Sequence, residues 1–254
     1  MKSYKLIRNK KIEEVTGKFF KNKQDEIISK VIFSGICGSD LSVYLGNHPY
    51  KKAPVVLGHE FIGEVKKNGI KVKNLNKNDL ITSLPYDYCG KCKYCKKRLT
   101  NHCNNKTTPS YQKWSGTFAE YFLSKKNSTY KLNKKINLLD GAMIEPFAIC
   151  NHALNLVLDK KIKNSLILGA GNTGLATLML AKINKRFKKM GIVDIHISRK
   201  KIVGKLGADY FIKYNSKNFI KKTSLLTKEE DIDVIFITCD YKNVINDAIH
   251  LIKP

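Results

Sequence analysis

The sequence is poor in arginine, which occurs at only four of its 254 positions. Of its 47 basic residues, 43 are therefore lysine, and against 21 acidic residues they give a formal charge of +26. Proteins that read phosphates and base edges favour arginine for its bidentate fork. The lysines are also spread along the whole chain instead of forming one patch. The composition therefore predicts a solvated lysine surface and no nucleic-acid partner.

Long apolar runs are also missing. No run approaches the roughly 18 residues of a membrane-spanning helix, and residues 1–8 lack the apolar core of a secretory signal. We therefore expect no membrane partner and a cytoplasmic location. Thiols stay reduced in that compartment, so clustered cysteines there indicate metal ligands more often than disulfides.

The chain divides into two patterns of secondary structure. Residues 1 to about 130 are typical of short strands between turns, with strand candidates at 26–33 and 118–123. Helical stretches then alternate with apolar strands near 165–168, 190–194, 209–213 and 233–238. Such alternation predicts parallel βαβ units. We expect a mainly-β domain over residues 1–150 and an α/β domain over residues 151–254.

A glycine motif follows the first strand of the α/β domain. Gly169, Gly171 and Gly174 form G-x-G-x-x-G between an apolar strand and a helix, the context that dinucleotide binding requires. Asp194 stands 20 residues beyond Gly174, where a carboxylate bonds a ribose 2′-hydroxyl and so favours NAD over NADP. A glycine turn without any ligand is the alternative. The predicted cofactor-binding residues are Gly169, Gly171, Asn172, Thr173, Gly174, Asp194 and Arg199.

Four cysteines are clustered within fifteen residues. Cys89, Cys92, Cys95 and Cys103 form C-x2-C-x2-C-x7-C, a spacing that can close a tetrahedral zinc site. An iron–sulfur cluster is the rival, but the bacterial ferredoxin pattern has a shorter last gap and a following proline. The spacing therefore favours structural zinc.

A second set of metal-binding residue types is spread along the sequence. Cys37, His59 and Glu145 each have an ordinary structural explanation when taken alone. Together they could supply three ligands and leave a fourth position open for water or substrate. An open position distinguishes a catalytic zinc from a structural one.

The motifs occur in an order that identifies a family. Their residues are Cys37–Asp40, Gly58-His59-Glu60 with Gly63, Gly69 and Val72, the four cysteines, Gly116–Tyr121, Ile144–Pro146 and Gly169–Gly174. The chain resembles a zinc-containing medium-chain dehydrogenase/reductase, the superfamily of alcohol, sorbitol and threonine dehydrogenases. Glutamate at position 145, where many simple alcohol dehydrogenases have cysteine, resembles the polyol and polyol-phosphate branch. Threonine dehydrogenases have a similar motif.

The resemblance implies a GroES-like catalytic domain followed by a doubly wound Rossmann sheet, with two zinc ions per chain and NAD. Cys37, His59 and Glu145 would bind the catalytic zinc, and Glu60 would bind the metal or stand back from it. Asp40 would orient His59, and Ser39 would take the substrate proton as hydride passes to NAD⁺. The implied substrate is a secondary alcohol, either a polyol or a sugar-alcohol phosphate.

The chain departs from the family pattern at several positions. Asn78 and Arg98 replace glycines, and Ser42 stands where some relatives extend the proton relay with histidine. Residues 184–189 follow the fingerprint helix, where relatives have a compact glycine turn. The sequence ends at Pro254, so we expect the sheet to lack strands five and six and the chain to lack part of the subunit interface of its homo-oligomeric relatives. Because of these departures, one alternative function is a truncated, inactive zinc-binding remnant. The motif at Glu145 leaves a second alternative, a threonine dehydrogenase-like activity.

Overall fold

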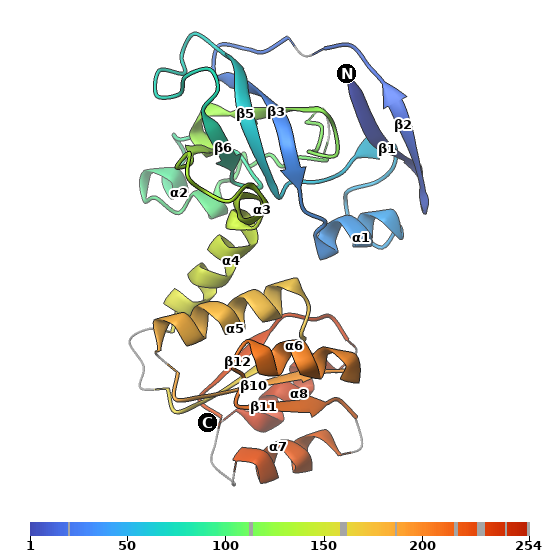
Figure 1. Ribbon diagram of the computed structural model, residues 1–254, viewed down its shortest axis with the longest axis vertical. Helices are drawn as coiled ribbons and strands as arrows, with labels where there is room; N and C mark the ends of the chain where they lie inside the picture. The colour runs from blue at the N-terminus through green and yellow to red at the C-terminus, as the bar shows by residue number, and fades with distance from the viewer. Residues whose placement is uncertain are drawn as a thin grey trace. The chain divides into compact units, whose positions relative to one another are not determined.

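The computed structural model describes residues 1–19, 21–111, 114–157, 162–185, 187–215, 218–227, 232–241 and 243–252. The chain forms two compact units, Met1–Glu145 and Pro146–Pro254 (Figure 1). The division falls inside helix α4 (Ile144–Asn155), the helix that also contains the boundary expected at residue 150. No described helix is long and apolar enough to cross a membrane.

The first unit is built on two antiparallel sheets. The larger sheet has the order β7-β3-β5-β6-β8, and the smaller one has the order β2-β1-β4. The strands are β1 (Lys2–Arg8), β2 (Lys11–Thr16), β3 (Glu26–Ser34), β4 (Val55–Val56), β5 (Phe61–Asn68), β6 (Leu80–Ser83), β7 (Tyr121–Lys125) and β8 (Thr129–Lys131). The short helices are α1 (Gly38–Tyr44), α2 (Lys93–Lys96) and α3 (Leu138–Ala142), with 3-10 turns at Thr100–His102 and Lys126–Ser128.

Strand β7 begins at Tyr121, so the strand expected at 118–123 was placed three residues too early. The preceding residues bond elsewhere: Phe118 N–H donates to the carbonyl of Leu57 at 2.9 Å, and Thr117 N–H donates to Gly58 at 3.0 Å. These bonds hold the loop before His59, which matters for the site described below. An apolar strand pattern alone does not show which neighbour its backbone will bond.

The second unit contains a parallel sheet with the order β11-β10-β9-β12. In chain order this is 3-2-1-4, which matches the first four positions of a doubly wound sheet. The strands are β9 (Asn164–Leu168), β10 (Lys189–Asp194), β11 (Tyr210–Lys213) and β12 (Val234–Ile237). The helices that follow α4 are α5 (Asn172–Asn184), α6 (Lys200–Lys205), α7 (Phe219–Thr227) and α8 (Val244–Leu251), with a 3-10 turn at Ile197–Arg199. The expected fold class is therefore confirmed in the described residues.

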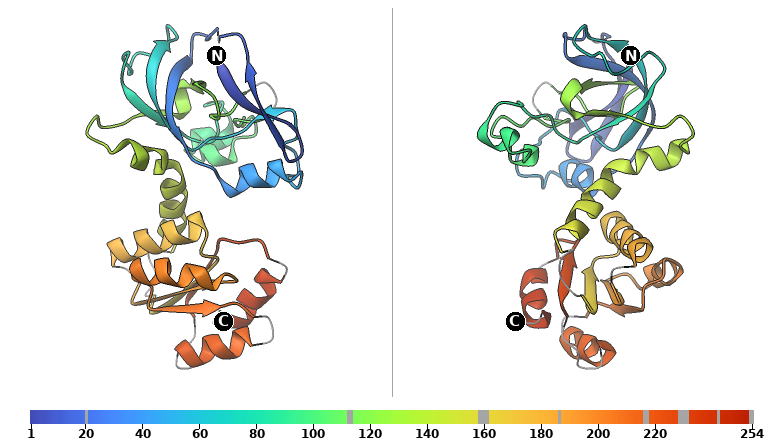
Figure 2. Two further views of the ribbon diagram at one scale, coloured as in Figure 1. Left: turned by 45° about the vertical axis from the view of Figure 1, so that its right-hand side comes forward. Right: turned by 90° about the vertical axis from the view of Figure 1, so that its left-hand side faces the viewer.

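Helices cover both faces of this sheet, as Figure 2 shows. Successive side chains of a strand point to opposite faces, and all five residues of β9 are buried. Ile167 joins the cluster that includes Leu178 of α5 and Val203 of α6. Leu166 joins the opposite cluster, with Phe219 of α7. This double burial explains why the strands appear as continuous apolar runs in the sequence.

Left-handed backbone occurs at Asn78 and Arg98, where the family resemblance implies glycine, and at Lys185, in the segment where it implies a glycine turn. Asn78 has φ 68°, Arg98 has φ 62°, and Lys185, which ends α5, has φ 49°. The left-handed region costs most residues about 1–2 kcal/mol, although asparagine tolerates it better. At these positions the backbone is left-handed, although none of the three residues is glycine, which adopts this conformation most readily.

Lys185→Gly is expected to stabilise the second unit by about 0.5–1 kcal/mol, because glycine is the favoured residue at a left-handed helix end. Urea unfolding measures the change. Asn184→Gly is the matched control, since position 184 still belongs to the right-handed helix α5 and glycine there costs about 0.5–1 kcal/mol. Equal destabilisation by both substitutions would refute the explanation.

Candidate functional site

Asp40 joins the two segments that carry Cys37 and His59. It lies in the first turn of α1 and is only 3% exposed. Its Oδ2 accepts the N–H of Cys37 at 3.0 Å, and its Oδ1 accepts the N–H of Gly58 at 3.0 Å. A carboxylate is favourable near a helix N-terminus. Asp40 therefore holds the start of α1 against the loop before β5.

Cys37, His59 and Glu60 form a potential metal site. One ligand atom from each lies within 4.8 Å of the others. His59 and Glu60 are buried, and Cys37 is half-buried. A Cβ at Gly35 would overlap the Oε2 atom of Glu60, so glycine at that position leaves room for the carboxylate.

The electrostatics of this trio fit a bound cation. Burial raises the pKa of the Cys37 thiol and of the Glu60 carboxyl above their ordinary values. Burial also lowers the pKa of His59, whose Nδ1 is buried and has no hydrogen-bond partner among the described residues. A divalent cation would stabilise the thiolate and the carboxylate and would bind neutral imidazole. Sulfur, nitrogen and oxygen donors of this kind suit zinc.

Glu145, the predicted third ligand, lies outside the trio. It is in the first turn of α4 and is 8% exposed. Burial, followed by the negative charges of Glu60 and Asp40, raises the pKa of Glu145 to about 7. The charges of Glu60 and Asp40 therefore act on Glu145. Glu60, which was expected either to bind the metal or to stand back from it, is the carboxylate of the trio.

Two other predicted residues lie beside the trio. Ser39 is half-buried, and its hydroxyl and amide donate hydrogen bonds to the Cys37 sulfur, which oppose the burial that raises the pKa of this thiol. Asp40 Oδ1 is 3.8 Å from His59 Nδ1, which is too far for a hydrogen bond. The expected orienting bond is therefore not formed in this structure.

The structure adds Lys51, a residue that the sequence did not indicate. Only 9% of its surface is exposed. Burial lowers the pKa of Lys51, and the charges of Asp40 and Cys37 raise it. It therefore lies within electrostatic reach of the trio. Among 43 lysines, no pattern in the sequence distinguishes this one.

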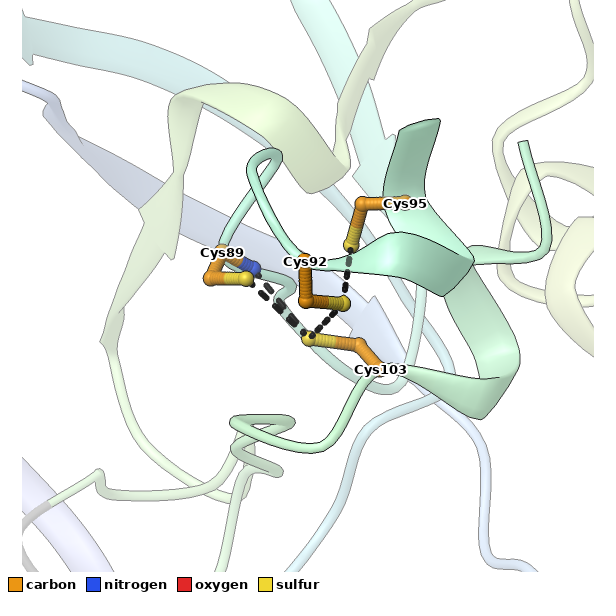
Figure 3. A group of neighbouring side chains, drawn as sticks. All are labelled: Cys89, Cys92, Cys95 and Cys103. Atoms are coloured by element: carbon orange, nitrogen blue, oxygen red, sulfur yellow. Dashed lines mark hydrogen bonds between the residues drawn. The ribbon is translucent and has the colours of Figure 1, made fainter. Parts of the chain in front are cut away.

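The four cysteines converge on one point, as Figure 3 shows. The sulfur of Cys92 lies 3.5 Å from that of Cys95 and 4.0 Å from that of Cys103, and Cys103 lies 3.6 Å from Cys89. Zinc–sulfur bonds of about 2.3 Å in a tetrahedron separate the sulfurs by about 3.8 Å. The amides of Lys91 and Cys92 lower the pKa of Cys89 to about 6, which favours the thiolate that a metal requires.

The lobe that carries these cysteines has no apolar core. Between residues 88 and 107, Cys103 is the only buried residue. Its regular structure is the four-residue helix α2 and the 3-10 turn Thr100–His102. The sulfur cluster is therefore the feature that can hold this lobe together.

The glycine turn of the second unit leaves space at a helix N-terminus. Gly169 has φ +106°, and a Cβ at Gly174 would overlap the carbonyl oxygen of Gly169. A Cβ at Gly171 would meet nothing within 4 Å. Gly171 is the N-cap of α5 and no side chain caps this helix, so no capping side chain occupies its first amides, at Asn172 and Thr173. Such amides bind phosphate.

Asp194 lies at the end of β10 beside this turn. Its Oδ2 accepts the N–H of Ala170 at 2.8 Å and pairs with Arg199 Nη1 at 2.7 Å, and its Oδ1 accepts the N–H of His196 at 2.8 Å. Burial alone would raise the pKa of Asp194, but the amides of His196 and Ala170, followed by Arg199, outweigh it and lower the pKa. Asp194 is therefore a carboxylate held in a fixed position.

The chain is similar to several known proteins. Residues 23–134 match the family described as "Alcohol dehydrogenase GroES-like domain". The chain is 31% identical over 231 residues to the D-arabitol-phosphate dehydrogenase of Enterococcus avium, covering 90% of this chain and 65% of that protein. It is 30% identical over 244 residues to the zinc-type alcohol dehydrogenase-like protein YdjJ of Escherichia coli, covering 91% and 67%.

Among solved structures, galactitol-1-phosphate dehydrogenase from Escherichia coli superposes with a TM-score of 0.91 at 27% identity, covering 100% of this chain and 73% of that one. The chain thus spans about two thirds of the length of the curated relatives it matches. The family match, the relatives and the fold agree with one another. The chain therefore belongs to the zinc-type alcohol dehydrogenases of the medium-chain dehydrogenase/reductase superfamily.

Proposed function

We propose that the chain is a zinc- and NAD-dependent dehydrogenase that oxidises a secondary alcohol of a polyol or sugar-alcohol phosphate. The observation that carries the proposal is the trio of Cys37, His59 and Glu60, whose ligand atoms lie within 4.8 Å of one another. A dehydrogenase of this kind also needs a binding site for the dinucleotide cofactor, and the glycine turn with Asp194 would provide it.

Cys37 and His59 would hold the catalytic zinc, with Glu60 or Glu145 as the carboxylate ligand. When bound, zinc supplies Lewis acidity that lowers the pKa of an alcohol. Ser39 lies beside Cys37 and would accept the hydroxyl proton. With serine at position 42, the proton would leave through water or a ribose hydroxyl. The four cysteines would hold a second, structural zinc.

The amides at the start of α5 would bind the pyrophosphate of the cofactor, since Gly171 leaves that approach open. Asp194 would accept a hydrogen bond from the adenosine ribose. Its lowered pKa keeps it ionised at neutral pH, and an ionised carboxylate repels the 2′-phosphate of NADP. Arg199 is already paired with Asp194, so its charge is partly neutralised. These features favour NAD.

Similar proteins support the substrate class. One relative is a D-arabitol-phosphate dehydrogenase and another is a galactitol 1-phosphate 5-dehydrogenase. The proposed location is the reducing cytoplasm, which keeps clustered cysteines available as metal ligands.

The test is NADH formation by the purified 254-residue chain with two equivalents of zinc, using galactitol, sorbitol, arabitol and their phosphates. We expect turnover with at least one of these alcohols and a zinc content of two per chain. If the chain holds two zinc ions yet reduces no NAD⁺ with any of these alcohols, the proposal of an active enzyme is wrong. The alternative of an inactive zinc-binding protein would then be favoured.

A further inference from the structure

Thr238 directly follows strand β12 and lies against the glycine turn. Its hydroxyl is 2.9 Å from the carbonyl oxygen of Gly169 and 3.0 Å from that of Leu168, and it shares its one proton between them. The backbone N–H of Thr238 also donates to the Leu168 carbonyl, at 2.9 Å. The Gly169 carbonyl accepts no other hydrogen bond within the described residues. This carbonyl therefore depends on the Thr238 hydroxyl.

The same hydroxyl lies between the first and the third glycine of the motif. A Cβ at Gly169 would be 3.0 Å from Thr238 Oγ1, and a Cβ at Gly174 would be 2.8 Å from it. Gly174 belongs to the first turn of α5, which begins at Asn172. Thr238 is therefore close to the turn itself and to the start of the helix whose first amides would bind pyrophosphate.

Backbone and side-chain groups from β10 hold the other side of this turn. The carbonyl of Val193 accepts the N–H of Gly169 at 2.8 Å, and Asp194 Oδ2 accepts the N–H of Ala170 at 2.8 Å. Strand β9, which leads into the turn, lies between β10 and β12 in the sheet. Thr238 therefore supplies the restraint from the β12 side, on a glycine whose φ of +106° leaves its backbone free to move.

We propose that Thr238 is a positioning residue for the dinucleotide: its hydroxyl fixes the Gly169 carbonyl and, through the turn, the first amides of α5 that face the cofactor pyrophosphate. This rests on the NAD binding in the proposed function above. Donors that are already fixed bind an anion more tightly than mobile ones, because less conformational entropy is lost on binding. Asp194 is held separately by His196 and Arg199, so its contact with the adenosine ribose should not need Thr238.

Isothermal titration calorimetry of the zinc-loaded full chain with ADP-ribose tests the proposal, since ADP-ribose carries the pyrophosphate without the nicotinamide. Thr238→Val removes the hydroxyl at nearly constant size. We expect it to weaken ADP-ribose binding about 5- to 10-fold, the effect of one lost hydrogen bond. Binding of adenosine, which lacks phosphate and is titrated by NMR, should be unchanged. Thr238→Ser keeps the hydroxyl and should retain the affinity for ADP-ribose.

Thr223→Val is the matched control. Thr223 is fully buried in α7 of the same unit, and its hydroxyl donates to the carbonyl of Phe219 at 2.9 Å. Both valine variants should lower Tm by similar amounts, because each removes one hydroxyl hydrogen bond to a carbonyl. Only Thr238→Val should weaken ADP-ribose binding. If Thr238→Val is unfolded at the assay temperature, Thr238→Ala and Thr223→Ala provide the same comparison.

Four results would overturn the proposal. They are unchanged ADP-ribose affinity in Thr238→Val, equal weakening by Thr223→Val, an equal loss of adenosine binding, and a loss of affinity in Thr238→Ser. An absence of ADP-ribose binding by the wild-type chain would overturn it as well.

The two proposals fail separately. A wild-type chain that binds ADP-ribose but reduces no NAD⁺ refutes the proposed function, while the comparison of Thr238→Val with Thr223→Val still decides the role of Thr238. In an active chain, Thr238→Val should raise KM for NAD⁺ and change kcat little. Turnover with an unchanged KM for NAD⁺ would keep the function and reject the positioning role.

Discussion

Cys37→Ser is expected to abolish turnover while leaving the fold intact. Cys37 supplies the sulfur of the trio, and no other cysteine belongs to that cluster in the described residues. Serine is a weak zinc ligand at neutral pH, because its hydroxyl does not ionise there. Loss of the metal removes the group that lowers the pKa of the alcohol. We expect kcat/KM to fall about 10³-fold or more, which corresponds to roughly 4 kcal/mol.

Zinc content provides a second measurement for this variant, and it should fall from two ions per chain to one. Circular dichroism should be unchanged, since Cys37 is only half-buried. Ser42→Ala is the matched control on the same helix α1, because Ser42 lies outside the trio. Full activity in Cys37→Ser would show that the trio is not the catalytic metal site.

Removal of metal from the four-cysteine lobe is expected to unfold residues 88–107 locally. Cys103 is the only buried residue of that segment, so no apolar packing would replace the lost zinc bonds. Cys103→Ser should therefore expose the lysines of the lobe to trypsin, with cleavage about 100-fold faster or more, because proteolysis follows the population of the open form.

Mass spectrometry of the fragments locates the cleavage. The core formed by Phe61, Trp114 and Phe122 should resist under the same conditions, since it does not depend on the cysteines. Cys239→Ser, which changes a thiol outside both clusters, should leave the lobe protected. Unchanged protection in Cys103→Ser would mean that the lobe is stabilised by something other than metal.

The second unit was more predictable from the sequence than the first. Strands such as β9 are buried on both faces, so each strand of the parallel sheet is a continuous apolar run between turns. Those strands lie within about one residue of their expected positions. The predicted start of β7 was wrong because residues 117–120 form backbone hydrogen bonds with the loop before His59 and with β1. Such pairing depends on partners distant in sequence.

At the candidate metal site, the sequence indicated the residue types but not their geometry. Cys37, His59 and Glu60 come together, whereas Glu145 stays outside the trio. Which carboxylate joins the trio, that of Glu60 or that of Glu145, depends on where the backbone places each residue. Glycine at position 35 leaves room for the carboxylate of Glu60. Lys51 could not have been found from the sequence, since burial alone distinguishes it from the other lysines.

The sulfur spacing of the cysteine lobe also has a consequence for oxidation. Neighbouring sulfurs lie 3.5–4.0 Å apart, and a disulfide needs about 2.0 Å. Bound zinc occupies the sulfur lone pairs that an oxidant would attack. A chain depleted of zinc in the presence of peroxide would lose two thiols for each disulfide formed, and the remaining pair could not rebuild a four-sulfur site. Zinc supply and thiol reduction would therefore have to act together to keep the lobe folded.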